Sequence, residues 1–427
     1  MTGRDTIFAL SSGRPPAAVS VIRVSGPRAH EAAVAIAGPL PQPRTAVVRP
    51  LRHPHSGEII DEALVLRFDS PASSTGEDVV EFQCHGGRAV VDAVLDVLTS
   101  FEQLRVAQPG EFTRRAFENG RIDLTEAEGL ADLLEAETES QRKAALALAG
   151  GGLRKEVSDW QQRLLGLSAE AERAIDYDEA DEQIGPSLQR ACGALADELR
   201  SWLDRPRIER LKDGVRIVVA GTPNAGKSSL LNAIVGEERA IVTPVPGTTR
   251  DHIEVPLSLG GVPVLLTDTA GLRESVDEVE AIGVARAARL IEAADVLVWL
   301  GDRDNAPAHQ RIICVYPKSD LAERLSAPAG ALPVSSVTGA GLADLLRQVE
   351  DCARGLLPSD DAISLNRRQA QHVGAAAEAL ASARDASDLV LLAEHLRLAR
   401  TAFDRLTGRA GVEEVLDALF SRFCLGK

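Results

Sequence analysis

The residues best suited to chemistry lie in residues 215–229, which read VRIVVAGTPNAGKSS. An apolar run leads into Gly221 and Gly226, and Lys227 and Ser228 follow, so the segment matches the G-x-x-x-x-G-K-[ST] phosphate loop between a strand and a helix. In such a loop, backbone N–H groups surround a polyphosphate, the lysine reaches the β- and γ-phosphates, and the serine hydroxyl binds Mg²⁺. The predicted phosphate-binding residues are Asn224, Ala225, Gly226, Lys227, Ser228 and Ser229.

Two later segments offer groups for the metal ion and the γ-phosphate. A strand-like run over residues 262–267, behind a hairpin turn at Gly260 and Gly261, ends in a D-x-x-G motif made of Asp268, Thr269, Ala270 and Gly271. Its carboxylate can reach Mg²⁺ and its glycine N–H can meet the γ-phosphate. The preceding loop is rich in hydroxyls and can close over that phosphate, or it is an ordinary loop with threonines facing solvent. The predicted contacts in this loop are Thr243, Pro244, Val245, Pro246, Gly247, Thr248 and Thr249.

The elements that must position these loops alternate between strands and helices. Strands are predicted over residues 295–300, 311–316 and 332–336, and a helix over 340–355, which gives a doubly wound parallel sheet with the nucleotide at its carboxyl edge. The sequence here resembles the guanine-nucleotide-binding domains of GTPases, whose base-recognition motif is N-K-x-D. Asp320 would accept from guanine N1 and N2, and Lys318 would cover the base. Pro317 departs from that motif, and the run Ser335, Ser336, Val337 matches the S-A-K motif only loosely.

The residue after D-x-x-G decides how the attacking water is oriented. Many GTPases have a glutamine there, but this chain has Leu272, which cannot orient water. Another polar group must do so. Carboxylates follow closely, and sequence alone leaves open which of them acts or whether they only complement a helix N-terminus: Glu274, Asp277, Glu278 and Glu280.

Composition limits the class of protein. The chain has 427 residues, 44% hydrophobic and 26% charged, which predicts a soluble protein of two or three domains. The N-terminus lacks a signal-peptide core, so a cytoplasmic location is expected. Five scattered cysteines predict reduced, mostly buried thiols. The net charge of −16 argues against broad nucleic-acid binding, although local arginines could contact RNA or merely face solvent: Arg114, Arg115, Arg121, Arg367 and Arg368.

The remaining segments define the domain organisation. Residues 1–120 read as α+β, with strands over 19–24, 63–67 and 79–84, a Pro-rich loop over 39–54, and a helix over 89–101. Helical periodicity runs from residue 123 to 203, with breaks at Pro186 and Pro206, and returns over 389–406. We therefore predict an N-terminal α+β domain (1–120), a helical domain in two parts (121–212 and 358–427), and an inserted Ras-like G domain (213–357), with linkers at 210–214 and 358–361.

Several motifs in order along the whole chain resemble the MnmE (TrmE) family of tRNA modification GTPases. They are IRVSGP, GEDVVEFQCHGG, FTRRAFENGRIDLTEAE, GTPNAGKSSLLN, PGTTRD, DTAGLRESVDEVEAIGV and the terminal FCLGK. The resemblance implies a homodimeric, K⁺-stimulated GTPase that forms a heterotetramer with an MnmG (GidA)-like flavoprotein. Together they would introduce an aminomethyl or carboxymethylaminomethyl group at C5 of tRNA wobble uridine 34. The carbon would come from 5-formyl- or 5,10-methylene-tetrahydrofolate.

The resemblance also implies roles for individual residues. Asn224, Thr243, Val245 and Thr248 match the family's K⁺ ligands, and Ser228 and Thr249 match its Mg²⁺ ligands. Glu280 matches the water-activating carboxylate. The residues that match the folate contacts are Arg23, Glu81, Arg121 and the terminal Lys427. Cys424 matches the family's C-terminal cysteine, which is either a reactive thiol or a small buried apolar residue.

Two other functions remain open on sequence grounds. One is a regulatory GTPase switch that acts in ribosome assembly without RNA chemistry. The other is a folate-dependent one-carbon transferase with a degenerate GTPase. Mass spectrometry of tRNA nucleosides separates the first from the main hypothesis, and folate binding tests the second.

Overall fold

The computed structural model describes residues 5–176, 185–237, 254–268, 280–321, 327–358, 363–410, 413–424 and 426. The chain divides into two compact units. Unit 1 comprises Met1–Ala131, Leu153–Val157 and Phe403–Lys427, and unit 2 comprises Asp132–Gly152 and Ser158–Ala402. No helix among the described residues is both long enough and apolar enough to cross a bilayer.

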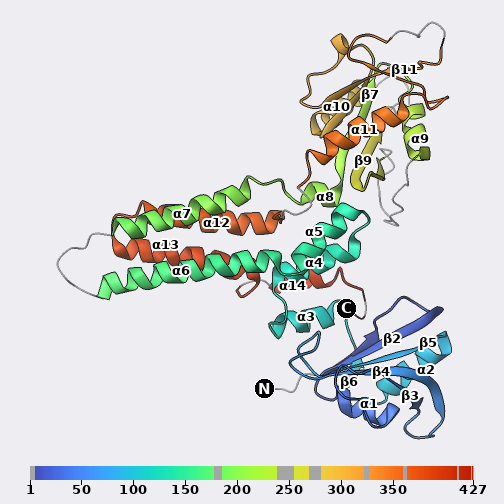
Figure 1. Ribbon diagram of the computed structural model, residues 1–427, viewed down its shortest axis with the longest axis vertical. Coiled ribbons are helices and arrows are strands. Elements are labelled where there is room, and N and C mark those ends of the chain that lie inside the picture. The colour runs from blue at the N-terminus through green and yellow to red at the C-terminus, as the bar shows by residue number, and fades with distance from the viewer. Residues whose placement is uncertain are drawn as a thin grey trace. The chain divides into compact units, whose positions relative to one another are not determined.

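Unit 1 is built on a six-stranded sheet (Figure 1). Its order is β3-β4-β5-β2-β1-β6, with antiparallel neighbours except for the parallel pair β1–β6. Alternate residues on β1, β2, β4 and β5 are buried against two helices, and Phe8, Ile22 and Phe82 are fully buried in this core. The elements are β1 Thr6–Leu10, β2 Ala17–Ser25, α1 Ala29–Ala37, β3 Val47–Arg52, β4 Ile59–Phe68, β5 Val79–Gly86, α2 Arg88–Thr99 and β6 Leu104–Val106.

The other face of this sheet is partly covered near β1. Ile7 and Ala9 pack against Phe112 of α3 (Glu111–Glu118). Helix α14 (Glu413–Phe420) comes from the end of the chain and packs near α3 and the start of α4 (Leu124–Glu135). The approach is close, because a Cβ at Gly110 would lie 2.3 Å from the Phe420 carbonyl oxygen. The C-terminal segment is thus held in the N-terminal unit.

The structure confirms the predicted strands and helix of this unit and corrects the Pro-rich loop. Residues 47–52, expected in a loop, form β3 and include Pro50. Proline cannot donate a ladder hydrogen bond, but β3 is an edge strand and needs donors on one side only. Residues 47–52 can therefore form a strand because this strand lies at the edge of the sheet, and the local sequence does not reveal that position.

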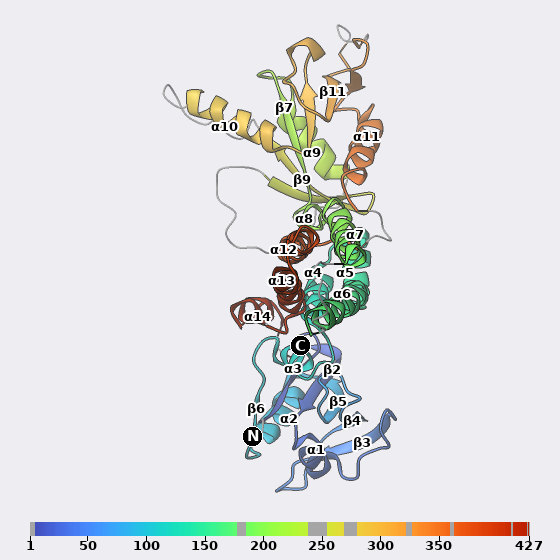
Figure 2. The same ribbon diagram turned by 90° about the vertical axis from the view of Figure 1, so that its left-hand side faces the viewer.

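Four long helices, which lie mostly in unit 2, run side by side in both views (Figure 1, Figure 2). Trp160 and Trp202, from two of them, meet edge to face with centroids 5.3 Å apart. Pro186, predicted as a break, is the first residue of a helix, where its missing N–H costs nothing. These helices are α6 Gly152–Asp176, α7 Pro186–Leu203, α12 Arg367–Arg384 and α13 Leu389–Thr407, and a shorter helix, α5 (Glu139–Ala149), precedes them.

Unit 2 also contains the predicted doubly wound sheet. Its order is β12-β11-β10-β7-β9-β8, and neighbours are parallel except β8, which is antiparallel to β9. The hairpin turn at Gly260 and Gly261 is confirmed. The elements are β7 Val215–Gly221, α9 Lys227–Glu237, β8 Glu254–Leu259, β9 Val262–Asp268, α10 Glu280–Ala293, β10 Val296–Leu300, the 3₁₀ helix Arg303–Asn305, β11 Ile312–Pro317, β12 Leu332–Val334 and α11 Leu342–Arg354.

The segment expected as the first linker is not extended. Arg210 lies in helix α8 (Glu209–Asp213), which ends at Gly214 with φ +80°. Leu211 of α8 is buried in the core of the second sheet, and its carbonyl accepts a hydrogen bond from Gln141 Nε2 at 3.0 Å. Lys212 Nζ pairs with Asp132 Oδ1 at 2.5 Å. Burial of one apolar side chain in an otherwise polar segment turned a predicted linker into a packed helix. Of the second predicted linker, residues 359–361 lie outside the described residues.

Candidate functional site

The phosphate loop joins β7 to α9 and has the backbone conformation that its residue types allow. Gly221 has φ +155° and Gly226 has φ +96°, and a Cβ at Gly221 would lie 2.3 Å from the Leu300 carbonyl oxygen. Asn224 is left-handed at φ +61°, a conformation that asparagine adopts more readily than most residues. Glycine is therefore required at Gly221 by both conformation and space.

Lys227 places its charge inside this loop. The side chain is 8% exposed, and Nζ donates hydrogen bonds to the carbonyl oxygens of Gly221 at 3.2 Å and Thr222 at 3.0 Å. Lysine has three donors on a compact cation, which suits binding to phosphate oxygens. The loop thus holds a positive charge where the motif requires it.

Ser228 and Asp268 come together from distant parts of the chain. The Ser228 hydroxyl donates to Asp268 Oδ2 at 2.6 Å, and Asp268 is 2% exposed at the end of β9. The contact follows from the parallel pairing of β7 and β9, in which Val219 lies opposite Asp268. A hydroxyl and a carboxylate, with phosphate oxygens, form the all-oxygen ligand set that Mg²⁺ prefers.

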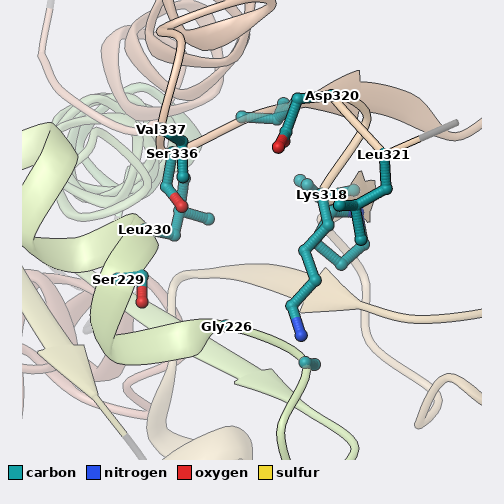
Figure 3. Close-up of a pocket in the computed structure, with 12 residues that line it drawn as sticks. Gly226, Ser229, Leu230, Lys318, Asp320, Leu321, Ser336 and Val337 are labelled. Carbon is teal, nitrogen blue, oxygen red and sulfur yellow. The ribbon is translucent and has the colours of Figure 1, made fainter. Parts of the chain in front are cut away.

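A pocket of about 220 Å³ opens beside the phosphate loop (Figure 3). Lys318 extends from one wall toward Gly226, and its Nζ donates to the Asn224 carbonyl oxygen at 3.0 Å. Its backbone is left-handed at φ +60°. The pocket is lined by Ala225, Gly226, Ser229, Leu230, Val315, Pro317, Lys318, Asp320, Leu321, Val334, Ser336 and Val337.

The base-recognition residues divide between lining the pocket and shaping its wall. Asp320, Ser336 and Val337 line it. Ser335 is fully buried, and its hydroxyl accepts from the N–H groups of Val337 at 3.2 Å and Thr338 at 3.1 Å, so it fixes the loop instead. The sequence analysis did not identify the apolar lining residues Leu230 and Leu321. Their only sequence signal is that each directly follows a motif residue.

Several predicted site residues lie outside the described residues or are described only in part. Glu280 begins α10, but its side chain is not described. The predicted residues outside the description are Thr243, Pro244, Val245, Pro246, Gly247, Thr248, Thr249, Thr269, Ala270, Gly271 and Lys427, together with Leu272.

In unit 1 the sheet register joins two of the predicted folate contacts. Arg23 on β2 lies opposite Glu81 on β5, and Arg23 Nε donates to Glu81 Oε1 at 2.9 Å. Their side chains are 23% and 16% exposed. The Arg23 guanidinium also lies 5.5 Å from the ring centroid of Phe112, a contact that the sequence analysis missed. The pair therefore presents a cation and a carboxylate on a partly open sheet face, with the buried ring of Phe112 beneath the guanidinium.

The other predicted folate contacts of unit 1 are Arg121 and the C-terminal residue Lys427, and the structure relates Arg121 and the segment before Lys427 to the Arg23–Glu81 pair differently. The Ser11 hydroxyl, just after β1, donates to the Gly426 carbonyl oxygen at 2.8 Å, so the C-terminal segment meets the strand that pairs with the Arg23 strand. Among the described residues, Arg121 forms no hydrogen bond or ion pair with Arg23 or Glu81. Arg121 instead lies beside the loop at Gly76.

The thiols follow the prediction with one exception. All five cysteines are free, and Cys84, Cys192 and Cys314 are buried. Burial raises the pKa of the Cys84 thiol to about 12 and that of Cys192 to about 11, which keeps both protonated near neutral pH. Cys424 is exposed, so the alternative of a buried apolar role is wrong.

The sequence left open whether Arg114 and Arg115 contact RNA or face solvent, and neither alternative fits the buried Arg115. Arg115 is only 5% exposed and pairs with Glu77 at 3.1 Å and Glu111 at 3.1 Å. Arg114 is neutralised by Glu118 at 3.2 Å and Asp417 at 2.9 Å. These arginines help to hold α3 in place through Glu77 and Asp417, which lie outside this helix, while Glu111 and Glu118 are part of it.

The fold and the site together define a P-loop nucleotide-binding protein with an adjoining base pocket. Family models match two parts of the chain: "GTP-binding protein TrmE N-terminus" over residues 6–121 and "MnmE helical domain" over residues 124–424. The chain belongs to the MnmE (TrmE) family of tRNA modification GTPases, and it is a GTP-hydrolysing enzyme of that family.

Individual relatives agree over the full length. The chain is 51% identical over 426 residues to the tRNA modification GTPase MnmE of Erythrobacter litoralis, covering 99% of this chain and 100% of the relative. It is 49% identical over 432 residues to the MnmE of Zymomonas mobilis, with the same coverage. Among solved structures, the G domain of the T. maritima FeoB iron transporter is 25% identical and covers 33% of this chain and 98% of its own, with a TM-score of 0.24. The family assignment rests on the full-length identities.

Proposed function

We propose that this GTPase converts GTP to GDP and phosphate with Mg²⁺ and K⁺ bound at the phosphate loop. The observation that carries the proposal is the contact between Ser228 and Asp268 at 2.6 Å beside the buried Lys227. Ser228, Asp268 and Thr249 would hold Mg²⁺, which neutralises charge that develops on the β- and γ-oxygens. Those three residues supply only oxygen ligands, as this ion requires.

The potassium part of the proposal is supported by Asn224. Its backbone carbonyl accepts a hydrogen bond from Lys318, while its exposed side-chain amide makes no hydrogen bond with any residue that the structure describes. The amide oxygen is therefore available to a cation next to the phosphates. With Thr243, Val245 and Thr248 it would complete a set of oxygen ligands for K⁺, which would stabilise charge in the transition state.

We propose that Glu280 activates the attacking water, since Leu272 cannot, and that two G domains meet when nucleotide and K⁺ are bound. Helix α10 begins at Glu280, nine residues after Gly271 of the D-x-x-G motif. The chain would act as a homodimer in the cytoplasm, where free cysteines such as these stay reduced. The four-part division at residues 120, 212 and 357 is part of the same proposal, and the two sheets fall within its first and third parts.

The experiment compares phosphate release in KCl and NaCl at equal ionic strength, for the full chain and for Asn224→Ala. The proposal expects turnover at least about tenfold faster in KCl, and loss of that difference in the variant. GDP affinity should change little in the variant, because Lys227 and Ser228 remain. Equal turnover in both salts would contradict the potassium site but leave GTP hydrolysis in place.

We also propose that unit 1 binds a tetrahydrofolate whose one-carbon unit is used, with an MnmG-like flavoprotein, to modify C5 of wobble uridine 34 in tRNA. The support is the Arg23–Glu81 pair over Phe112. An arginine suits the glutamate tail and a carboxylate suits the pterin donors. The buried Phe112 ring helps to hold the Arg23 guanidinium in place. Arg121, Lys427 and Cys424 are proposed to act at the same site.

Nucleoside mass spectrometry of tRNA from cells that lack the gene tests this function. Loss of the C5 modification at position 34, restored by the wild-type chain but not by Lys227→Ala, is the expected result. Wobble uridines that stay modified would instead favour the regulatory switch in ribosome assembly. Calorimetry with 5-formyl-tetrahydrofolate tests the cofactor separately, and undetectable binding would remove the folate part alone.

A further inference from the structure

The base pocket contains polar groups that the protein itself leaves unused. Asp320 and Ser336 line the pocket, and neither side chain makes a hydrogen bond or ion pair with any described residue. Figure 3 shows them on facing walls. By contrast, Lys318 is held by the phosphate loop and Ser335 by its own loop. Among the described lining residues, the side-chain groups without a hydrogen-bond partner are therefore the Asp320 carboxylate and the hydroxyls of Ser336 and Ser229, and Ser229 lies on α9, on the phosphate-loop side of the pocket.

Guanine needs more than an acceptor. Its N1–H and N2 amino groups donate, which suits Asp320, but its O6 and N7 atoms only accept. An O6 atom buried without a donor would lose the hydrogen bond that it makes with water, at a considerable cost in affinity. A pocket that holds guanine should therefore supply a donor near the carboxylate.

Position 317 cannot supply that donor. The N-K-x-D motif has an asparagine there, whereas Pro317 has no side-chain donor and no backbone N–H. The second base-recognition motif, S-A-K, differs as well, because Ser336 occupies the position at which that motif has alanine. Compared with these two motifs, position 317 therefore lacks a polar side chain and position 336 carries an additional hydroxyl.

The two positions are neighbours in the sheet. Pro317 at the end of β11 lies opposite Val334 at the end of β12, and Ser336 follows two residues later. The loops that carry Asp320 and Ser336 are tied together, since the Ser319 N–H donates to the Val334 carbonyl oxygen at 3.3 Å. The Ser336 hydroxyl is thus fixed at the same edge of the sheet as the Asp320 carboxylate.

We propose that the Ser336 hydroxyl is a specificity-determining group that donates a hydrogen bond to the six-position oxygen of the bound purine, in a pocket where Pro317 supplies no donor. The proposal rests on GTP occupying this pocket. The pocket then selects a six-oxo purine through Ser336 and a two-amino purine through Asp320.

The test measures dissociation constants of three diphosphates by competition with a fluorescent ribose-labelled GDP on the full chain. GDP and IDP carry the six-position oxygen, and 2-aminopurine riboside diphosphate lacks it. Ser336→Ala should weaken GDP and IDP by the same factor, about fivefold to tenfold, and leave the 2-aminopurine nucleotide unchanged. That unchanged affinity also shows that the variant folds. Thr338→Val removes a hydroxyl from the same loop, outside the pocket lining, and should alter none of the three.

Two results would overturn the proposal. If Ser336→Ala weakens all three nucleotides equally, the hydroxyl only maintains the loop. If it weakens none, a backbone N–H serves the oxygen instead. Failure of the underlying assumption looks different, because Asp320→Ala would then leave GDP affinity unchanged, which would mean that the base lies elsewhere.

Discussion

The nucleotide site of unit 2 takes its phosphate-binding groups from one short run, residues 221–228, whereas the Arg23–Glu81 pair of unit 1 joins two strands far apart in sequence. In the first, strained glycines and a helix start place Lys227 and Ser228 almost without help from other segments. In the second, antiparallel register places Arg23 opposite Glu81. A locally encoded site can be recognised as a motif, and a site made by register cannot.

The two sites should also differ in how much their residues contribute to the stability of the fold. Lys227 is bonded to carbonyls of its own loop, so its removal should leave the fold intact. The ion pairs near the unit 1 site also join α3 to the 75–78 loop. Substitutions there should affect folding as well as binding, and the predictions that follow exploit this difference.

The largest effect is expected from Lys227→Ala. Removal of a preorganised cation at the developing phosphate charge should lower GTP turnover by about 100-fold to 1000-fold. Steady-state phosphate release measures it, and the midpoint of thermal unfolding should stay within a few degrees of wild type. Lys155→Ala, an exposed lysine on α6, is the control and should turn over normally. A Lys227→Ala enzyme with wild-type turnover would refute the local nature of the phosphate site.

Glu280→Ala should come next, with turnover about 100-fold lower, as expected for loss of a general base. GTP affinity should stay within about twofold, since the residue is assigned to water and not to nucleotide. Single-turnover rates and equilibrium binding separate the two quantities. Glu292→Ala, on the last turn of the same helix, provides the matched control. Unchanged single-turnover rates in Glu280→Ala would remove the assignment.

Arg23→Ala should weaken binding of 5-formyl-tetrahydrofolate by about tenfold to 100-fold, the usual range for a charge-assisted hydrogen bond. Arg23→Lys should recover only part of the affinity, because lysine lacks the planar fork of arginine. Calorimetry measures both, with the exposed Arg14→Ala as control. GTP turnover in the absence of tRNA should not change. If Arg23→Ala abolished turnover as well, the two sites would not be separable in the way proposed here.

The smallest effect concerns stability and pH. Burial tends to raise the pKa of Glu111, but its bonds to Arg105 and the Gln108 N–H, with the nearby Arg115 charge, outweigh burial and lower it below the ordinary 4.5. A carboxyl with a lowered folded-state pKa stabilises the fold above about pH 4.5, and this contribution disappears as pH falls through the folded-state pKa.

Glu111→Gln should therefore lower the free energy of unfolding by about 1–3 kcal/mol at pH 7, and the difference from wild type should shrink as pH falls below about 4. Urea unfolding at several pH values measures this change. Glu118→Gln, in a more exposed pair with Arg114, should cost less than about 1 kcal/mol. A difference that grows toward low pH would contradict the direction given for Glu111.

Sequence patterns predicted the second sheet and the phosphate loop well because their signals are local. Buried β-branched runs identify strands such as β7, and the glycine spacing identifies the loop that follows. The patterns failed where burial depended on distant partners. Pro50 is tolerated because β3 is an edge strand, and α8 is helical because Leu211 packs into a core made of later strands.

The same division applies to the predicted site residues. Arg23 and Glu81 could be named only by resemblance, since nothing in either segment indicates that the other lies opposite. Phe112 could not be named, because its contact with Arg23 depends on α3 covering one end of the sheet. Arg115 was mistaken for a surface residue because one of its two carboxylate partners, Glu77, comes from another segment, although the other, Glu111, lies one turn away on the same helix.

The sequence by itself determined the chemical groups available to this protein: a phosphate-loop motif, an aspartate at a strand end that is proposed to bind Mg²⁺, a leucine where many GTPases have glutamine, and an altered base-recognition motif. The tertiary structure decided which groups meet. It joined Ser228 to Asp268 and Arg23 to Glu81, and it placed Ser336 and Asp320 in one pocket beside Pro317. The physical reason is that residue type and short spacing fix local backbone conformation, whereas contacts between strands depend on register and on burial, which only the folded chain defines.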